Sequence, residues 1–146
     1  MGAALPDASI LIAAVCDWHE HHDVAAPALA SALRSRAVVV AGPVLTEAYA
    51  VLTRMPPPHR LSPADTRAVL RENLAGLRMV SLDGRGYWQL VDDSASRQIA
   101  GGRAYDAVVV ACALRARAER ILTLNRRDFE ALVPPELVID CPLAEA

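Results

Sequence analysis

The sequence contains no lysine, and all fifteen of its basic residues are arginine. A Walker-type phosphate loop, a Schiff-base enzyme and a receiver-type phosphoacceptor site each need a lysine, so these three kinds of site are excluded. Cysteine is also scarce, because Cys16, Cys112 and Cys141 are odd in number, widely spaced and free of any C-x-x-C pattern. This spacing indicates buried, reduced thiols rather than metal-binding or redox cysteines.

Long hydrophobic runs are absent as well. No apolar run approaches the roughly 18 residues that cross a bilayer, and the N-terminus has neither a basic region nor a small-residue cleavage site. We therefore expect a cytoplasmic protein that does not bind membranes. A length of 146 residues, with 53% hydrophobic and 22% charged residues, indicates one folded domain over 1–146.

The net charge of −2 does not by itself indicate a nucleic-acid-binding protein. The distribution of charge is more informative, because residues 97–127 contain seven arginines and only two acids, whereas residues 1–50 contain two arginines and five acids. The arginine-rich segment can attract a polyanion. A solvated, arginine-rich helix end explains each of these arginines equally well.

Short apolar runs alternate with helical patterns along the whole chain. Runs of strand length occupy 3–5, 37–41, 79–82, 120–124 and 137–140, and helical patterns occupy 10–15, 24–33, 44–54, 66–74, 87–97, 105–118 and 129–132. This alternation predicts a three-layer α/β/α domain whose central parallel sheet has four to five strands. In such sheets, sites form at the carboxyl ends of the strands.

Four acids fall at the expected strand ends or at the starts of the helices that follow. Asp7 follows the first strand, and Asp128 comes just past the fourth. Glu47 and Asp106 each share an i, i+3, i+4, i+7 stripe with apolar residues, so we expect their side chains on buried helix faces. Taken singly, Asp7 and Asp128 also fit helix N-caps, and Asp106 fits a first helical turn.

Four carboxylates that converge would repel one another unless divalent cations offset their charge. Mg²⁺ or Mn²⁺ suits such a site, because these ions prefer hard oxygen ligands and retain water molecules. Ions of this kind can activate water and stabilise the leaving oxygen of a phosphodiester. The pattern therefore predicts chemistry that cuts nucleic-acid backbones.

Four segments in this order resemble the PIN-domain nucleases, above all the VapC-type toxins of bacterial toxin–antitoxin modules. They are PDASILI at 6–12, TEAYAVLTR at 46–54, YDA at 105–107 with its apolar continuation, and LTLNRRDF at 122–129. The resemblance spans roughly residues 4–133. It implies strand order 3-2-1-4-5, Mg²⁺- or Mn²⁺-dependent endoribonuclease activity, a homodimer, and a cognate VapB-type antitoxin whose C-terminal segment covers the active site.

The resemblance also assigns roles to individual residues. Asp7, Glu47 and Asp106 match the three metal-site acids of the family, with Asp7 and Asp106 as direct ligands. Many relatives carry an acid where this chain has Asn125. We therefore assign the fourth acid to Asp128, with Asn125 assisting.

Two hydroxyl residues and three aromatic residues have alternative interpretations. Ser9 and Thr46 neighbour the acids and can hydrogen-bond a carboxylate or a metal-bound water, although Ser9 fits a helix cap equally well. The aromatic side chains can stack on RNA bases, but packing in the core or at a dimer interface is the favoured interpretation of Trp18, Tyr87 and Trp88.

The rival hypothesis is a catalytically silent PIN-like module that acts as a regulatory partner of an antitoxin or DNA-binding protein. A silent site has no need of clustered acids, so the presence of Asp7, Glu47 and Asp106 argues against it. Metal binding discriminates between the two, because only the enzyme should bind Mn²⁺ through these acids.

Overall fold

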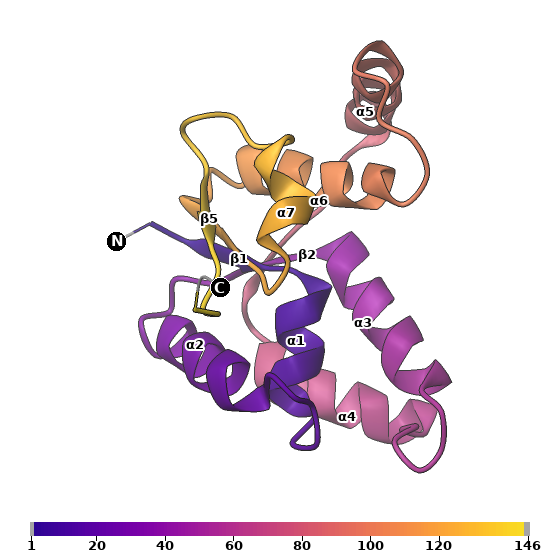
Figure 1. Cartoon of the computed structure of the whole chain (residues 1–146), viewed down its shortest axis with the longest axis vertical. Helices are drawn as coiled ribbons and strands as arrows, with labels where there is room; N and C mark the ends of the chain where they lie inside the picture. Colours follow the sequence, from indigo (N-terminus) through magenta and orange to yellow (C-terminus); the bar gives the residue numbers. More distant parts are fainter. Residues whose placement is uncertain (1, 145–146) are drawn as a thin grey trace.

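A computed structural model describes residues 2–144, so residue 1 and residues 145–146 of the expected domain lie outside the described part. Every strand and helix that the sequence predicts is present (Figure 1). In chain order the elements are β1 (Ala4–Pro6), α1 (Ala8–Val15), α2 (His22–Arg34), β2 (Val39–Ala41), α3 (Gly42–Arg54), α4 (Pro63–Leu74), β3 (Arg78–Val80), α5 (Gly84–Ser96), α6 (Arg103–Arg115), β4 (Arg120–Leu122), α7 (Arg126–Glu130) and β5 (Val138–Asp140).

All strand pairs in the described chain are parallel, as predicted. β4 lies between β1 and β5, and β2 pairs with β3. An isolated parallel bridge between Ala4 and Val38 joins the two parts of the sheet. The ladders agree with the order 3-2-1-4-5, but the step from β2 to β1 depends on this single bridge.

Helices cover the sheet on both sides. In Figure 1 the strands run between α1, α2, α3 and α4 on one side and α5, α6 and α7 on the other. All residues of β1 and β2 are buried, as expected for strands that are covered on both faces. The three-layer α/β/α architecture is therefore confirmed, with one contiguous hydrophobic core.

Helix starts differ from the sequence prediction, because polar caps begin helices before the first apolar residue. The Asp7 side chain accepts a hydrogen bond from the Ile10 amide, so α1 starts at Ala8 instead of residue 10. Ser62 caps α4 and Pro63 opens it, as the cap-proline-acid order of 62–65 predicts, so this helix extends before the apolar pattern 66–74. A cap satisfies backbone N–H groups that the first helical turn leaves without partners.

Of the two predicted environments of the aromatic side chains, the core is wrong, and packing at a dimer interface stays a prediction. Trp88 is 71% exposed, and Tyr87 on the same helix is exposed too, because α5 stands away from the body and contributes only Ser94 to the buried residues. Trp18 is also exposed and stacks on His59, with 4.0 Å between ring centroids.

Within the described residues, no helix has both the length and the apolar character that a membrane crossing requires.

Candidate active site

Asp7 lies at the carboxyl end of β1 and is buried, with 7% of its surface exposed. Its amide donates to the Leu122 carbonyl at the end of β4, with an N–O distance of 3.0 Å. Because Asp7 also caps α1, the two interpretations of this residue are compatible. The backbone of β1, β4 and α1 therefore fixes the position of this carboxylate.

Hydrogen bonds hold both oxygens of the Asp7 carboxylate. Oδ1 accepts from the Ser9 hydroxyl at 2.6 Å and from the Ile10 amide at 3.1 Å. Oδ2 accepts from the Thr123 hydroxyl at 2.6 Å. Burial nevertheless raises the pKa of Asp7, and these hydrogen bonds only partly oppose that effect.

Glu47 lies on α3, and its predicted burial is wrong. Val44 and Ala48 on the same stripe are buried, but Glu47 itself is exposed. A helical stripe is buried only where another element covers it, and no neighbour covers this part of α3 fully. The protein environment still acts on this carboxylate. Partial burial and then the charge of Asp7 raise the pKa of Glu47, whereas Arg54 lowers it.

Asp106 lies in the first turn of α6 and is half-buried. The three apolar residues of its stripe, Val109, Val110 and Ala113, are all buried. Asp106 therefore lies both on a buried apolar stripe and in a first helical turn, which are its two predicted environments. A position in the first turn favours a negative charge, because the backbone dipole points its positive end there.

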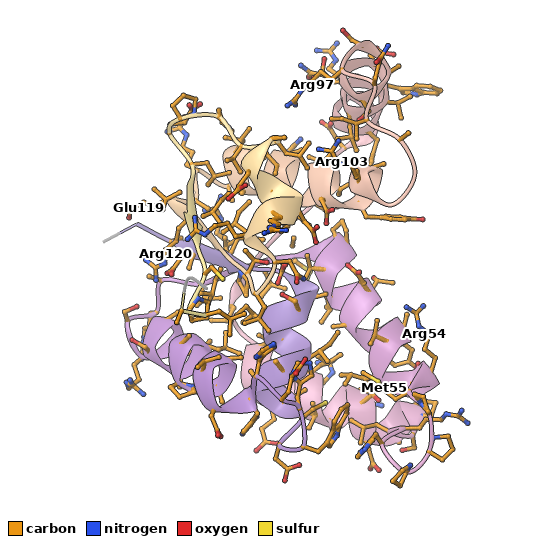
Figure 2. All side chains as sticks on the ribbon, in the orientation of Figure 1. Arg54, Met55, Arg97, Arg103, Glu119 and Arg120 are labelled. Carbon is orange, nitrogen blue, oxygen red and sulfur yellow. The ribbon has the colours of Figure 1, made fainter. Side chains whose placement is uncertain are left out.

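The charges of the other three acids all act on Asp106. The pKa of Asp106 rises to about 6, first through burial and then through the negative charges of Asp128, Asp7 and Glu47. Arg103, which is labelled beside α6 in Figure 2, partly opposes this rise. Carboxylates from four different elements thus share one region of negative potential.

Asp128 lies in the first turn of α7 and is exposed. The N-cap of α7 is Asn125, so the alternative assignment of Asp128 as an N-cap is wrong. The helix begins at Arg126, earlier than predicted, and this shift places Asp128 inside its first turn.

The remaining predicted residues differ in their contacts. Ser9 bonds to Asp7, and its oxygen also accepts from the Leu124 amide at 3.0 Å. Thr46 instead donates to the Gly42 carbonyl of its own helix, at 3.4 Å. The structure brings Ser9, but not Thr46, into hydrogen-bond contact with an acid.

Thr123 is the site residue that the sequence analysis missed. It is completely buried and bonds to Asp7 across 116 positions of the sequence. The available signal was a hydroxyl side chain within the otherwise apolar run 121–124. A buried hydroxyl needs a hydrogen-bond partner, so Thr123 was a candidate partner for a nearby carboxylate.

The donor set fits a hard divalent cation, because it consists of carboxylate oxygens. Burial first, and then repulsion from neighbouring carboxylates, raises the pKa of Asp106 and of Glu47. Among residues 2–144, no three His, Cys, Asp or Glu side chains form a group that could hold a metal ion as they lie.

The four acids do not line either of two cavities in the described part of the chain. Cavities of about 650 Å³, between α3 and α4, and about 370 Å³, between α5 and α6, are lined by other described residues.

Comparisons with known proteins show the family of the chain. Residues 4–133 match the PIN domain family. The ribonuclease VapC40 of Mycobacterium tuberculosis is 37% identical over 125 residues, which cover 86% of this chain and 88% of that relative.

Two solved structures share the fold at low sequence identity. The crystal structure of Mycobacterium tuberculosis VapC20, a sarcin–ricin loop cleaving toxin, has a TM-score of 0.72 at 16% identity and covers 90% of this chain and 97% of its own. DNA-bound VapBC from Salmonella typhimurium has a TM-score of 0.68 at 19% identity and covers 98% of this chain and 100% of its own. On its sequence match, its relatives and its fold, the chain belongs to the PIN domain family and, within it, to the VapC-type ribonucleases.

Proposed function

We propose that this chain is a Mg²⁺- or Mn²⁺-dependent endoribonuclease and the toxin of a VapBC-type toxin–antitoxin module. The observation that carries the proposal is the electrostatic coupling of Asp106 to Asp128, Asp7 and Glu47 at one edge of the sheet. Its relative VapC40 carries the name ribonuclease. The same coupling disfavours the silent regulatory module, because a binding surface gains nothing from repelling carboxylates.

The four acids have different roles in binding the cation. Asp7 and Asp106 are the direct ligands, Glu47 and Asp128 complete the negative site, and Asn125 assists. These residues would hold a divalent ion, and its chemistry there would be to lower the pKa of a water molecule and to offset charge on the leaving oxygen of the phosphodiester. Asp7 is held by three hydrogen bonds, so its carboxylate is oriented before any ligand arrives.

Arginines beside the acids supply the contacts to RNA phosphates. Arg103 lies on the first turn of α6 with Asp106, and Arg127 is exposed on α7 with Asp128. Contacts of this kind give affinity without reading the sequence of bases.

The proposed partners are a cognate VapB-type antitoxin, whose C-terminal segment covers the acids, and a second copy of the chain. Salmonella VapBC, which shares the fold, is an assembly of this type. The exposed apolar side chains Tyr87, Trp88 and Val91 on α5 give a homodimer a surface to bury. We place the protein in the cytoplasm, without membrane contact.

The test is cleavage of purified total RNA by the isolated chain with Mn²⁺, Mg²⁺ or EDTA, with the fragment ends sequenced. Asp7→Asn removes a proposed ligand but keeps a side chain that can cap α1. Asp17→Asn is the matched control, because Asp17 is exposed and outside the acidic site.

The proposal predicts discrete cuts that need the metal, vanish in Asp7→Asn and persist in Asp17→Asn. Full metal-dependent cleavage by Asp7→Asn would show that the site is assigned wrongly. A folded wild-type chain that neither binds Mn²⁺ nor cuts RNA would favour the silent module.

A further inference from the structure

Thr123 occupies a rigid position directly after β4. Its side chain is completely buried, and its amide donates to the Asp140 carbonyl at 3.0 Å, which continues the ladder between β4 and β5. Backbone and side chain are therefore both fixed, so the hydroxyl has one available position.

The direction of the hydroxyl proton follows from its neighbours. The Asn125 amide donates to Oγ1 of Thr123 at 3.0 Å, and Oδ2 of Asp7 lies 2.6 Å from the same atom. A hydroxyl group has one proton and two lone pairs. Because the amide proton already uses a lone pair, the hydroxyl proton points to the carboxylate.

The two oxygens of Asp7 are not equivalent. Oδ1 accepts two hydrogen bonds, from the Ser9 hydroxyl and the Ile10 amide, which together use its lone pairs. Oδ2 accepts one hydrogen bond, from Thr123, and keeps a lone pair free. The oxygen that Thr123 orients is thus the one that can bind a further ligand.

We propose that Thr123 is a positioning residue that orients Oδ2 of Asp7 toward the metal ion. Through the Asn125 amide it also ties Asp7 to the turn that carries Asn125 and leads to Asp128. This inference rests on the proposed function, because it concerns the same metal site. It adds that one hydroxyl joins the acids of β1 and α7 into a single unit.

Three variants test this assignment. Thr123→Val keeps the volume of the side chain and removes its hydrogen bonds, whereas Thr123→Ser keeps the hydroxyl. Thr66→Val is the matched control, because Thr66 is also completely buried and its hydroxyl donates to the Ser62 carbonyl at 2.8 Å, on α4 and away from the acids. If Thr123→Val does not fold, Thr123→Ala removes the hydroxyl without a methyl group against Asp7.

The measurements are the Mn²⁺ dissociation constant from calorimetric titration, the kcat and KM of RNA cleavage, and the unfolding midpoint. For Thr123→Val we expect Mn²⁺ binding and kcat each to fall by about 10- to 100-fold, which is typical for the loss of a partner that orients a metal ligand. KM for RNA should change little, and Thr123→Ser should restore Mn²⁺ binding. Thr66→Val should lower the unfolding midpoint without changing Mn²⁺ binding.

Mn²⁺ affinity of Thr123→Val equal to that of the wild type would overturn the inference while leaving the proposed function intact. An equal loss of Mn²⁺ affinity in Thr66→Val would also overturn it, because the effect would then follow stability alone. A wild-type chain that binds no Mn²⁺ would contradict the proposed function itself, and the role of Thr123 with it.

Discussion

Asp106 differs from a surface aspartate because burial and three other carboxylates oppose its ionisation. Its pKa is about 6 in the folded chain, against a usual value of 3.8. The folded state therefore keeps a proton between these pH values that the unfolded state releases. The stability that this proton contributes is present at low pH and is lost as pH rises through about 6.

The variant Asp106→Asn removes this charge permanently. Without metal at pH 8, we expect it to be about 1 kcal/mol more stable than the wild type, since solvent screens a half-buried carboxylate and reduces the full effect. Urea unfolding at pH 8 and at pH 4 measures this, and the two proteins should converge at pH 4. A variant that is less stable than the wild type at pH 8 would contradict the repulsion between the acids.

Cleavage should follow the ionisation of the same residue. A protonated Asp106 cannot serve as a metal ligand, so the cleavage rate at limiting Mn²⁺ should rise as pH increases through about 6. The pH profile of kcat/KM at two Mn²⁺ concentrations tests this, because more Mn²⁺ competes with the proton and should move the rise to lower pH. A pH profile of kcat/KM that does not change with the Mn²⁺ concentration would show that Asp106 is not a metal ligand.

At the scale of helices and strands, the sequence predicted every element but placed several boundaries wrongly. Apolar periodicity reports the buried part of a helix, whereas the first turn depends on caps such as Asp7, Ser62 and Asp83. The same limit explains why Glu47 is exposed although its stripe predicts burial. A stripe pattern does not show where the neighbouring element that covers the helix ends. Sequence periodicity therefore located the acids but not the exposure of each side chain.

Ser62 offers a test of capping that is separate from catalysis. Its hydroxyl accepts from the Asp65 amide at 3.0 Å, so Ser62→Ala should cost about 0.5–2 kcal/mol in the free energy of unfolding. Chemical denaturation measures the loss, and Ser31→Ala on the exposed side of α2 serves as a control without a capping role. RNA cleavage by folded Ser62→Ala should keep its Mn²⁺ dependence, and a changed dependence would connect α4 to the acidic site.

At the scale of the whole molecule, the acidic site depends on contacts between distant parts of the chain. The motifs identified the four acids in sequence order, because Asp7 follows a recognisable strand, Glu47 lies on a helix stripe, and Asp106 and Asp128 lie in first helical turns. The link from Thr123 to Asp7 spans 116 positions, and no local pattern encodes it. The exposure of α5 is likewise a property of the packed molecule, because its apolar side chains Tyr87, Trp88 and Val91 remain exposed although the sequence predicts only that the segment is helical.

The central claim is that four acids from separate elements form one metal site. Its most direct test is calorimetric titration of Mn²⁺ into the wild type, into the single variants of the acids, and into the control Asp17→Asn. The variants are Asp7→Asn, Glu47→Gln, Asp106→Asn and Asp128→Asn. We predict that all four weaken Mn²⁺ binding, that Asp7→Asn and Asp106→Asn weaken it most, and that the control matches the wild type. Unchanged Mn²⁺ affinity in both Asp7→Asn and Asp106→Asn would contradict the claim.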